Sequence, residues 1–155
     1  PFDLILCLYD SVNHLDGIES VAVMARAAAE AARPGALLVV DLNTALAFVG
    51  WAGTDEVIDD EFGRLAGRGS YDAETGEASL HLEGYLLDET GEKRWFAETE
   101  TERLLDPAAL LAALTRAGWG SHRLTTYADL TAEVTAPDEA QRLVVVSLRA
   151  SEHDP

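Results

Sequence analysis

The chain has 155 residues, of which 28 are acidic and 11 basic, so its formal net charge is −17. This length is enough for one domain with a core, and an apolar content of 48% excludes a disordered acidic tail. The sequence pI of 4.3 argues against a nucleic-acid partner, because phosphate backbones are bound through lysine and arginine. We expect a cytoplasmic protein without a membrane partner, because no apolar run approaches the roughly 18 residues of a membrane helix and no signal-peptide pattern opens the chain.

The first predicted element is a strand at Phe2–Tyr9, with the sequence FDLILCLY. An unbroken apolar run of this length fits a strand that is covered on both faces, as in a parallel sheet. Cys7 lies inside this strand and is the only cysteine, so we expect a small buried hydrophobe and no disulfide framework. The polar cluster Asp10-Ser11-Val12-Asn13-His14 follows, as is typical of the carboxyl end of a strand.

A helix and a second strand come next. The helix is predicted from about Ile18 to Arg33, with an apolar stripe at helical spacing, and Pro34-Gly35 ends it. Ala36–Leu42 (ALLVVDL) has the apolar run of a second buried strand, and polar residues follow it at Asn43 and Thr44. Strand, helix and strand at this spacing predict a right-handed βαβ unit.

From Asp55 to Arg103 the pattern changes to an alternation with a period of two. Turns are predicted at Ala73-Glu74-Thr75-Gly76 and Asp88-Glu89-Thr90-Gly91, so this segment is interpreted as an antiparallel meander with one face in water. It holds 15 acidic and 5 basic side chains, which places −10 of the net charge of −17 on this segment.

The last part of the chain predicts one helix and two strands. Asp106-Pro107 starts the helix, with aspartate as N-cap and proline in the first turn, and Gly118 ends it. A weak strand is predicted near His122 to Thr126, a loop at Thr131–Ala140, and a final strand at Leu143–Arg149.

This layout leaves the first strand short of neighbours. Two parallel strands with one helix between them cannot cover both faces of a sheet, and a buried strand at Phe2–Tyr9 is a poor place for a domain to begin. The chain starts with Pro1, and its only methionine is Met24. We therefore expect the natural protein to continue upstream, and we expect the exposed edge of this strand to favour association.

The block FDLILCLYDSVNHL, followed by a helix ending in ARPG and by ALLVVDLNT, resembles class I S-adenosylmethionine-dependent methyltransferases. The match is to their second half. Phe2-Asp3-Leu4 would open the fourth strand, Pro34-Gly35 would precede the fifth, Ala117-Gly118-Trp119 would lead into the sixth, and Leu143–Arg149 would be the seventh, inserted antiparallel. The meander resembles the small sheet that some small-molecule methyltransferases insert after the fifth strand to cover the substrate.

The resemblance implies an α/β fold, with a partial Rossmann-like sheet of strands four to seven and an inserted antiparallel meander. It implies one incomplete domain over 1–155, with a βαβ unit at 1–50, the meander at 51–105, and a helix plus the last two strands at 106–150. The family's glycine-rich cofactor loop has no match, because Gly67-Arg68-Gly69 lies inside the meander and not between a strand and a helix. Roughly three upstream strand–helix units, or about 90 residues, would carry that loop.

The resemblance also implies S-adenosylmethionine as cofactor, at the carboxyl ends of the strands where α/β sheets bind ligands. Leu8, Tyr9 and Asp10 would lie along its methionine part. Methyl transfer needs placement and sometimes a base, and Asp10 or His14 would be that base. The alternative is structural: Asp10 and Asn13 cap turns, and His14 packs on the next helix.

Substrate contacts are expected from Asn13 and Asn43, at the same strand ends. Five aromatic residues are candidates for a substrate wall: Trp51, Tyr71, Tyr85, Trp95 and Tyr127. Aromatic side chains in a meander more often pack in a core or across strands, so we expect one or two of the five to touch a ligand.

The run Glu98-Thr99-Glu100-Thr101-Glu102 places three carboxylates on one strand face. Carboxylates bind hard cations, but three in a row lack the converging geometry of a cage. A solvated strand face is therefore the preferred interpretation, as it is for Asp59-Asp60-Glu61. No histidine has metal-ligand spacing to another ligand, so no metal is expected.

These observations favour S-adenosylmethionine-dependent methyl transfer to a small molecule, with this chain as the C-terminal part of the enzyme and inactive alone. The first alternative is a catalytically inactive Rossmann-like binding or assembly module. The second is another α/β enzyme, such as a dehydrogenase, with its cofactor loop upstream.

Overall fold

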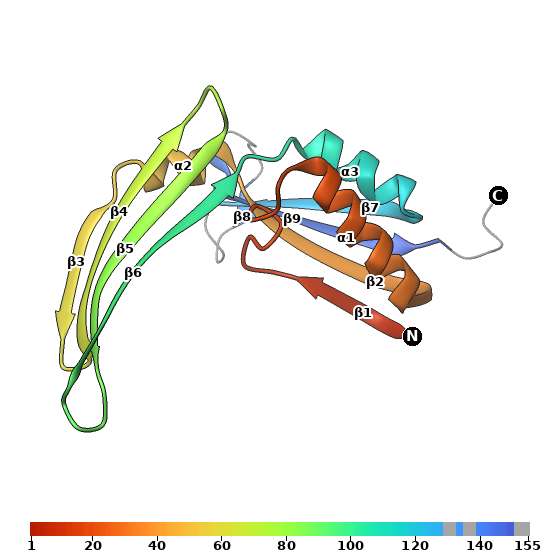
Figure 1. The fold of residues 1–155 in the computed structure, drawn as a ribbon. Helices are drawn as coiled ribbons and strands as arrows, with labels where there is room; N and C mark the ends of the chain where they lie inside the picture. The colour runs from red at the N-terminus through yellow and green to blue at the C-terminus, as the bar shows by residue number, and fades with distance from the viewer. Residues whose placement is uncertain (129–132, 135–138, 151–155) are drawn as a thin grey trace.

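The computed structural model describes residues 1–128, 133–134 and 139–150, and within them the chain forms two β-sheets and three helices (Figure 1). A five-stranded main sheet carries two of the helices, and a four-stranded meander extends from one of its ends. In this part of the chain, no helix combines the length and the apolar content needed to cross a membrane.

The main sheet has the strand order β1-β2-β9-β7-β8. Its strands are β1 (Phe2–Cys7), β2 (Ala32–Asn43), β7 (Trp119–Tyr127), β8 (Glu133–Val134) and β9 (Arg142–Arg149). β1 is parallel to β2, whereas β9 lies between β2 and β7 and is antiparallel to both. The predicted antiparallel insertion of the last strand is confirmed. Within the predicted loop at 131–140, residues 133–134 form β8, and 131–132 and 135–138 lie outside the described residues.

The connection between β1 and β2 is α1 (Ile18–Ala31), so the predicted βαβ unit is present. The helix ends before the predicted Arg33, because Ala32 already has extended backbone with φ −89° and ψ 146°. A proline disfavours helical backbone in the residue that precedes it, which explains why the helix ends upstream of Pro34. As a result, Pro34-Gly35 lies within β2 and not in a loop between helix and strand.

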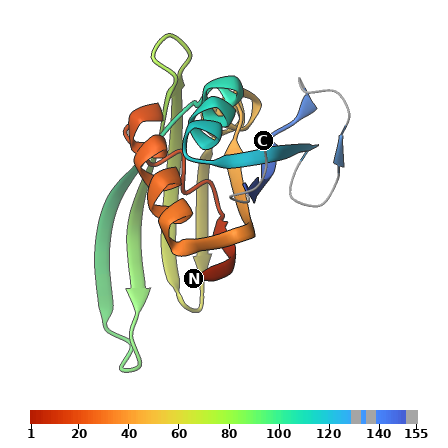
Figure 2. The same cartoon turned by 90° about the vertical axis from the view of Figure 1, so that its right-hand side faces the viewer.

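α1 and α3 (Pro107–Arg116) lie side by side on one face of the main sheet (Figure 2). Between them and the sheet lies a core of fully buried apolar side chains: Val21, Ala25, Leu38, Val40, Leu110, Leu114, Trp119 and Val145. The indole Nε1 of Trp119 donates a hydrogen bond of 3.0 Å to the carbonyl of Ala25, so this large ring is buried with its donor satisfied. Asp106 caps α3 as predicted, since its carboxylate accepts hydrogen bonds from two backbone N–H groups of the first turn.

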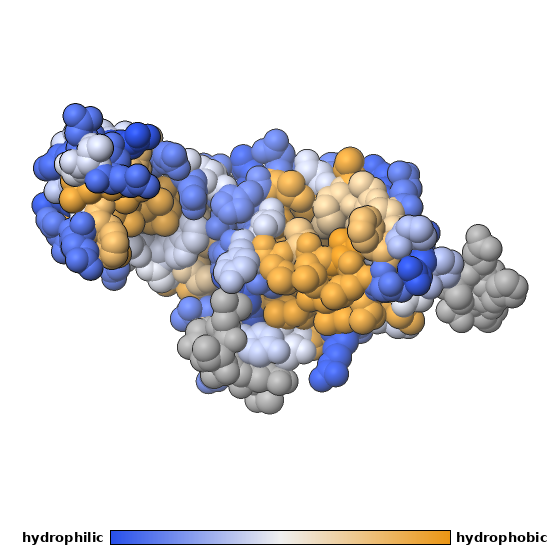
Figure 3. Space-filling view, turned by 90° about the horizontal axis from the view of Figure 1, so that it is seen from below, coloured by the Kyte–Doolittle hydropathy of each residue, from blue (hydrophilic) through white to orange (hydrophobic). Residues whose placement is uncertain are grey.

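None of the described helices covers the opposite face of the main sheet, and Figure 3 shows an apolar patch there. Leu4 of β1 pairs with Leu37 of β2, which pairs with Leu148 of β9, and these leucines are 49%, 40% and 38% exposed. We call this surface, with the neighbouring Leu6, the open face. Among the described residues, β1 has β2 as its only strand partner. The prediction that β1 is covered on both faces is therefore wrong for this structure, because only the side that carries Cys7 packs against the core.

The meander consists of β3 (Asp55–Asp60), β4 (Gly63–Asp72), β5 (Glu77–Leu87) and β6 (Lys93–Arg103), each antiparallel to the next. Both predicted turns are confirmed, since they join β4 to β5 and β5 to β6. The carboxyl ends of β1 and β2 point toward the meander, and the carboxyl end of β6 runs back toward the main sheet (Figure 1). The three strand ends therefore meet at one place.

A short helix that the sequence did not predict, α2 (Ala45–Trp51), links β2 to the meander. Its Phe48 is fully buried and packs against Trp51 and Tyr71, with ring centroids 5.6 Å apart in both pairs. Gly69 of β4 lies so close to the backbone of Trp51 that a Cβ would collide with it. The glycines at 67–69 therefore belong to a packed strand, as the sequence indicated, and not to a nucleotide loop.

Candidate functional site

The junction of the three strand ends is built around Asn13, which is fully buried. Its Oδ1 accepts a hydrogen bond of 2.9 Å from the backbone N–H of Asn43, at the end of β2. Its Nδ2 donates to the carbonyl of Arg103, at the end of β6, at 2.9 Å. The backbone N–H of Arg103 in turn donates to the Asn13 carbonyl at 2.8 Å. The predicted substrate contact for Asn13 needs correction, because its amide faces the interior and joins the meander to the main sheet.

The loop that follows β1 has unusual backbone geometry. The strand ends at Cys7, not at Tyr9, because Tyr9 and Asp10 adopt φ angles of 58° and 52°. Left-handed backbone is uncommon for residues other than glycine, and such strain clusters at functional sites. The Asp10 backbone N–H donates to Oδ1 of Asp41 at 2.9 Å, and the Ser11 hydroxyl donates to the Leu8 carbonyl at 2.6 Å. These bonds hold the strained turn in place.

Asp10 is held by two donors at the same oxygen. Nη1 of Arg142, at the start of β9, lies 2.8 Å from its Oδ2, and Nδ2 of Asn43 donates to the same atom at 2.9 Å. Arg142 also lies 3.8 Å from Asp41, and the side chains of Arg142 and Asp10 are only 14% and 18% exposed. Sequence reasoning missed Arg142, whose partner Asp10 is 132 positions away.

Glu102, at the end of β6, is the second residue that sequence reasoning missed. Its side chain is 2% exposed, so the predicted solvated face is wrong at this position, although Glu98 and Glu100 are exposed as predicted. Nδ2 of Asn43 donates to its Oε2 at 2.9 Å. Burial raises the pKa of Glu102 to about 7; the hydrogen bond from Asn43 opposes that rise, as do the nearby His14 and Arg142, whereas Asp10 adds to it.

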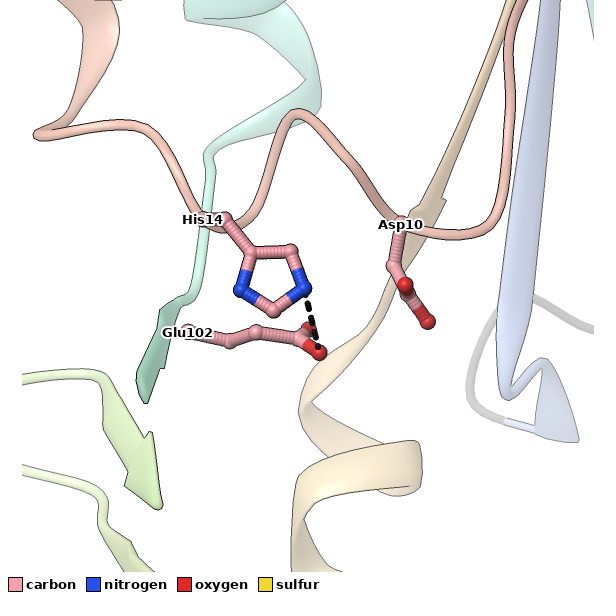
Figure 4. A group of neighbouring side chains, drawn as sticks. All are labelled: Asp10, His14 and Glu102. Carbon is pink, nitrogen blue, oxygen red and sulfur yellow. Dashed lines mark ion pairs between the residues drawn. The ribbon is translucent and has the colours of Figure 1, made fainter. Parts of the chain in front are cut away.

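His14 is the exposed partner of Glu102 (Figure 4). Its Nε2 lies 3.6 Å from Oε1 of Glu102, and its side chain is 41% exposed. Its Nδ1 lies 3.3 Å from the carbonyl oxygen of Thr101. A carbonyl can only accept a hydrogen bond, so Nδ1 carries the hydrogen in this contact. His14 therefore contacts β6, and the alternative in which it packs on the next helix is not what the structure shows.

Asp10, His14 and Glu102 have potential ligand atoms within 4.8 Å of one another, which is the spacing of a small metal site. The donors around them fit a cation poorly. Nδ2 of Asn43 already donates to both carboxylates, and Arg142 supplies a positive charge at Asp10. Amide and guanidinium hydrogens thus already occupy one oxygen of each carboxylate, and the cation of Arg142 lies beside Asp10, so the arrangement fits a metal ion poorly.

The predicted cofactor residues lie together at the edge of the site. Leu8 and Tyr9, with Asp41, Tyr127 and Val144, line a cavity of about 330 Å³ at the carboxyl end of the sheet. The Tyr9 side chain is 77% exposed and free to contact a ligand. Of the aromatic candidates, Tyr127 is the one that borders this cavity.

The other aromatic candidates lie elsewhere. Trp51 and Tyr71 pack around Phe48, as described above. Trp95 pairs with Tyr85 at a centroid distance of 5.0 Å and is 72% exposed. It lies eight residues along β6 from Arg103, which is roughly 27 Å at about 3.4 Å per strand residue. Trp95 therefore lies away from the junction and packs across strands, and its contact with a substrate stays a prediction.

Comparison with known proteins relates this architecture to one enzyme class. No family model and no curated protein matches the chain. Among solved structures, an S-adenosylmethionine-dependent methyltransferase from Clostridium acetobutylicum superposes with a TM-score of 0.75 at 16% identity, over 97% of this chain and 59% of that one. CalS10, an amino pentose methyltransferase from Micromonospora echinaspora, gives 0.63 at 18% identity, over 96% and 58%.

The sugar N-methyltransferase KedS8 from Streptoalloteichus gives a TM-score of 0.66 at 22% identity, over 97% of this chain and 57% of that one. The chain thus spans less than two thirds of the length of each of these enzymes. Identities this low establish the fold and not the activity. The resemblance identified from the sequence is confirmed at that level: the chain has part of the fold of the class I S-adenosylmethionine-dependent methyltransferases.

Proposed function

We propose that this chain forms the acceptor-binding part of an S-adenosylmethionine-dependent methyltransferase that acts on a small-molecule amine. The observation that carries the proposal is the junction itself. In a methyltransferase fold, the carboxyl ends of β1 and β2 bring Asp10, His14 and Asn43 against Glu102 of the meander. Ligands of open α/β sheets bind at this end of the strands.

The described residues fit one side of the cofactor. Leu8 and Tyr9 border the cavity beside the strained turn and would line the methionine part of S-adenosylmethionine. The glycine-rich cofactor loop that the resemblance implies has no counterpart among the described residues. When bound, S-adenosylmethionine supplies an activated methyl group, and the residues of this chain position the acceptor and manage its proton.

The edge of β1 and the open face offer a surface on which further cofactor-binding units could pack. The edge of β1 and the open face are apolar and unpaired, whereas buried parallel strands are normally covered on both faces. We propose that the complete enzyme places further strand–helix units there, and that these units carry the adenosine-binding loops. This chain alone would then lack methyltransferase activity.

The negative charge of the meander supports an amine as the acceptor. The meander concentrates acidic side chains, and a field of one sign raises the local concentration of an oppositely charged substrate. At neutral pH a small amine is a cation, so it is attracted to this surface. CalS10 and KedS8, named as an amino pentose methyltransferase and a sugar N-methyltransferase, agree with such an acceptor.

Titration calorimetry with S-adenosylmethionine tests the proposal. We expect weak or no heat of binding with the 155-residue chain and clear binding with a protein extended at its N-terminus by the preceding coding sequence. In the extended protein, Tyr9→Ala is expected to weaken binding, and Tyr85→Ala, the same substitution far from the site, is the matched control. Clear binding by the short chain contradicts the need for an added half. No binding by the extended protein overturns the methyltransferase proposal.

The second candidate function, an inactive binding or assembly module, is favoured by the same open face. Sedimentation of the 155-residue chain distinguishes the two. A stable self-association that persists in the extended protein, together with no binding of S-adenosylmethionine, supports the assembly module. Association that disappears in the extended protein supports the methyltransferase, because the added units then cover the open face.

A further inference from the structure

The strongest unexplained feature of the site is a carboxyl group that is buried beside an exposed base. Glu102 is 2% exposed, and its Oε1 faces Nε2 of His14 at 3.6 Å. Ionised carboxylates are costly to bury unless they are paired. Arg142, the cation of the site, is already bonded to Asp10. His14 is therefore the base that faces Glu102 and can exchange a proton with it.

The hydrogen on Nδ1 of His14 determines which atom of the imidazole faces the carboxyl group of Glu102. Because Thr101 accepts from Nδ1, a neutral His14 presents the lone pair of Nε2 toward Glu102. A lone pair facing a carboxylate is repulsive, so the contact is favourable only when a proton lies between them. That proton resides either on Nε2, opposite an ionised Glu102, or on Oε1, opposite a neutral imidazole. The contact of 3.6 Å can therefore take up and hold one proton.

We propose that Glu102 is the positioning residue and proton partner of His14: it orients the imidazole and shares the proton that Nε2 takes from the acceptor amine. This inference rests on the proposed function and extends it to a residue of the meander. The pair starts with a neutral imidazole and an ionised Glu102, and the acceptor's ammonium group loses one proton to Nε2. The freed nitrogen lone pair would then form the new carbon–nitrogen bond as the methyl–sulfur bond of the cofactor breaks, with its electron pair left on sulfur. This proton is the one that Nε2 and Oε1 then share, and it leaves to solvent past the exposed imidazole before the next turnover.

The other carboxylates near His14 have partners of their own, which leaves Glu102 as its proton partner. Asp10, from the loop after β1, already accepts two hydrogen bonds at Oδ2, from Arg142 and Asn43, so it anchors the site. Asp41, from β2, faces Arg142 at 3.8 Å. Asn43 donates to Glu102 and holds it in place. Glu102 is thus the carboxyl that faces the base, and its raised pKa of about 7 suits proton exchange near neutral pH.

Carboxyl carbon NMR on the 155-residue chain tests the shared proton without any methyl transfer. The Glu102 resonance is assigned by its loss in Glu102→Gln. We expect it to titrate with a pKa of about 7, and we expect His14→Gln to raise that pKa because a neighbouring positive charge is lost. His81→Gln is the matched control, since His81 also lies 3.7 Å from a glutamate, Glu83, but at an exposed position. Titration of Glu102 together with the exposed glutamates, or no response to His14→Gln, overturns the pair.

Kinetics of the complete enzyme with an amino sugar as acceptor test the role in transfer. Glu102→Gln is expected to lower kcat by about 100-fold, with KM nearly unchanged and the neutral limb of the pH profile lost. Glu83→Gln, the control, should match the wild type, and Glu102→Asp should recover part of kcat. Equal kcat values for Glu102→Gln and Glu83→Gln, or parallel changes in kcat and KM, overturn the relay. No transfer by the wild type overturns the proposed function, while the NMR titration still decides whether the pair exists.

Discussion

The main sheet and the meander bury their side chains to different extents. On the helix side of the main sheet, Leu38 and Val40 of β2 and Val145 of β9 are fully buried. In the strands of the meander, Ala78 and Glu102 are the only buried residues other than glycine among the described residues. The main sheet is therefore held by a core, whereas the meander is held by its hydrogen-bonded ladder and by its attachment to the main sheet. The junction around Asn13 therefore also attaches the meander to the main sheet.

A leucine-to-alanine substitution should lower the free energy of unfolding far more in the main sheet than in the meander. This is the largest of the expected differences. Leu38→Ala removes a fully buried side chain and should lower the free energy of unfolding by about 4 kcal/mol, because it leaves a cavity in the core. Leu86→Ala, in β5, removes a side chain that is 56% exposed and should cost less than about 0.5 kcal/mol. Urea unfolding measures both. Similar losses for the two variants would mean that the meander has a core of its own.

Asn13→Ala tests the attachment between the regions. The substitution leaves the backbone N–H and carbonyl of Asn43 and the carbonyl of Arg103 without their amide partner. Burying unsatisfied backbone groups is costly, so the free energy of unfolding should fall by about 3 kcal/mol. Amide hydrogen exchange should rise throughout β5 and β6 while the Leu38 amide stays protected. Asp16→Ala, at an exposed position in the same loop, is the control. Uniform loss of protection in both sheets would show that they unfold as one unit.

Local chemistry made much of this fold predictable. The turn at Asp88-Glu89-Thr90-Gly91 was identified because Asp88 accepts hydrogen bonds from the turn's own backbone and Gly91 supplies a φ of 82°. The capping of α3 by Asp106 is equally local. The apolar runs of β1 and β2 indicated their parallel pairing, and the family resemblance predicted that the last strand, β9, is inserted antiparallel. These features depend on residues that are close in the sequence or on a strong pattern.

The site depended on contacts that no local pattern contains. Glu102 belongs to an alternating run whose other members are exposed, and it is buried only because β6 ends against Asn43, 59 positions away. Arg142 is the first residue of a strand, and the sequence alone indicates an ordinary surface cation. Its contact with Asp10 is seen only in the structure. Trp95 was assigned to the substrate by residue type, whereas its distance from the junction is set by the length of β6. Contacts of this kind, between residues far apart in the sequence, can be identified only once the tertiary structure is known.

The pH dependence of the free energy of unfolding tests the junction by itself. It is the smallest of the three expected effects, after those of Leu38→Ala and Asn13→Ala. Burial raises the pKa of Glu102 in the folded chain from 4.5 to about 7. Below the ordinary value of 4.5 the group is protonated in both states and costs nothing. As the pH rises, the unfolded chain ionises first, so Glu102 progressively favours unfolding until the folded pKa is passed. Between about pH 5 and pH 8 this should lower the free energy of unfolding by about 2 kcal/mol.

Glu102→Gln removes this titration while keeping the shape of the protonated group. The variant should therefore gain stability relative to the wild type as the pH rises through this window, and urea unfolding at several pH values measures the difference. Glu100→Gln, at an exposed position on the same strand, should follow the wild type at every pH. If Glu102→Gln also followed the wild type, Glu102 would be ionised in the folded chain at all these pH values. The junction would then be a fixed ion-pair network joining the two sheets, not a site where a proton is exchanged.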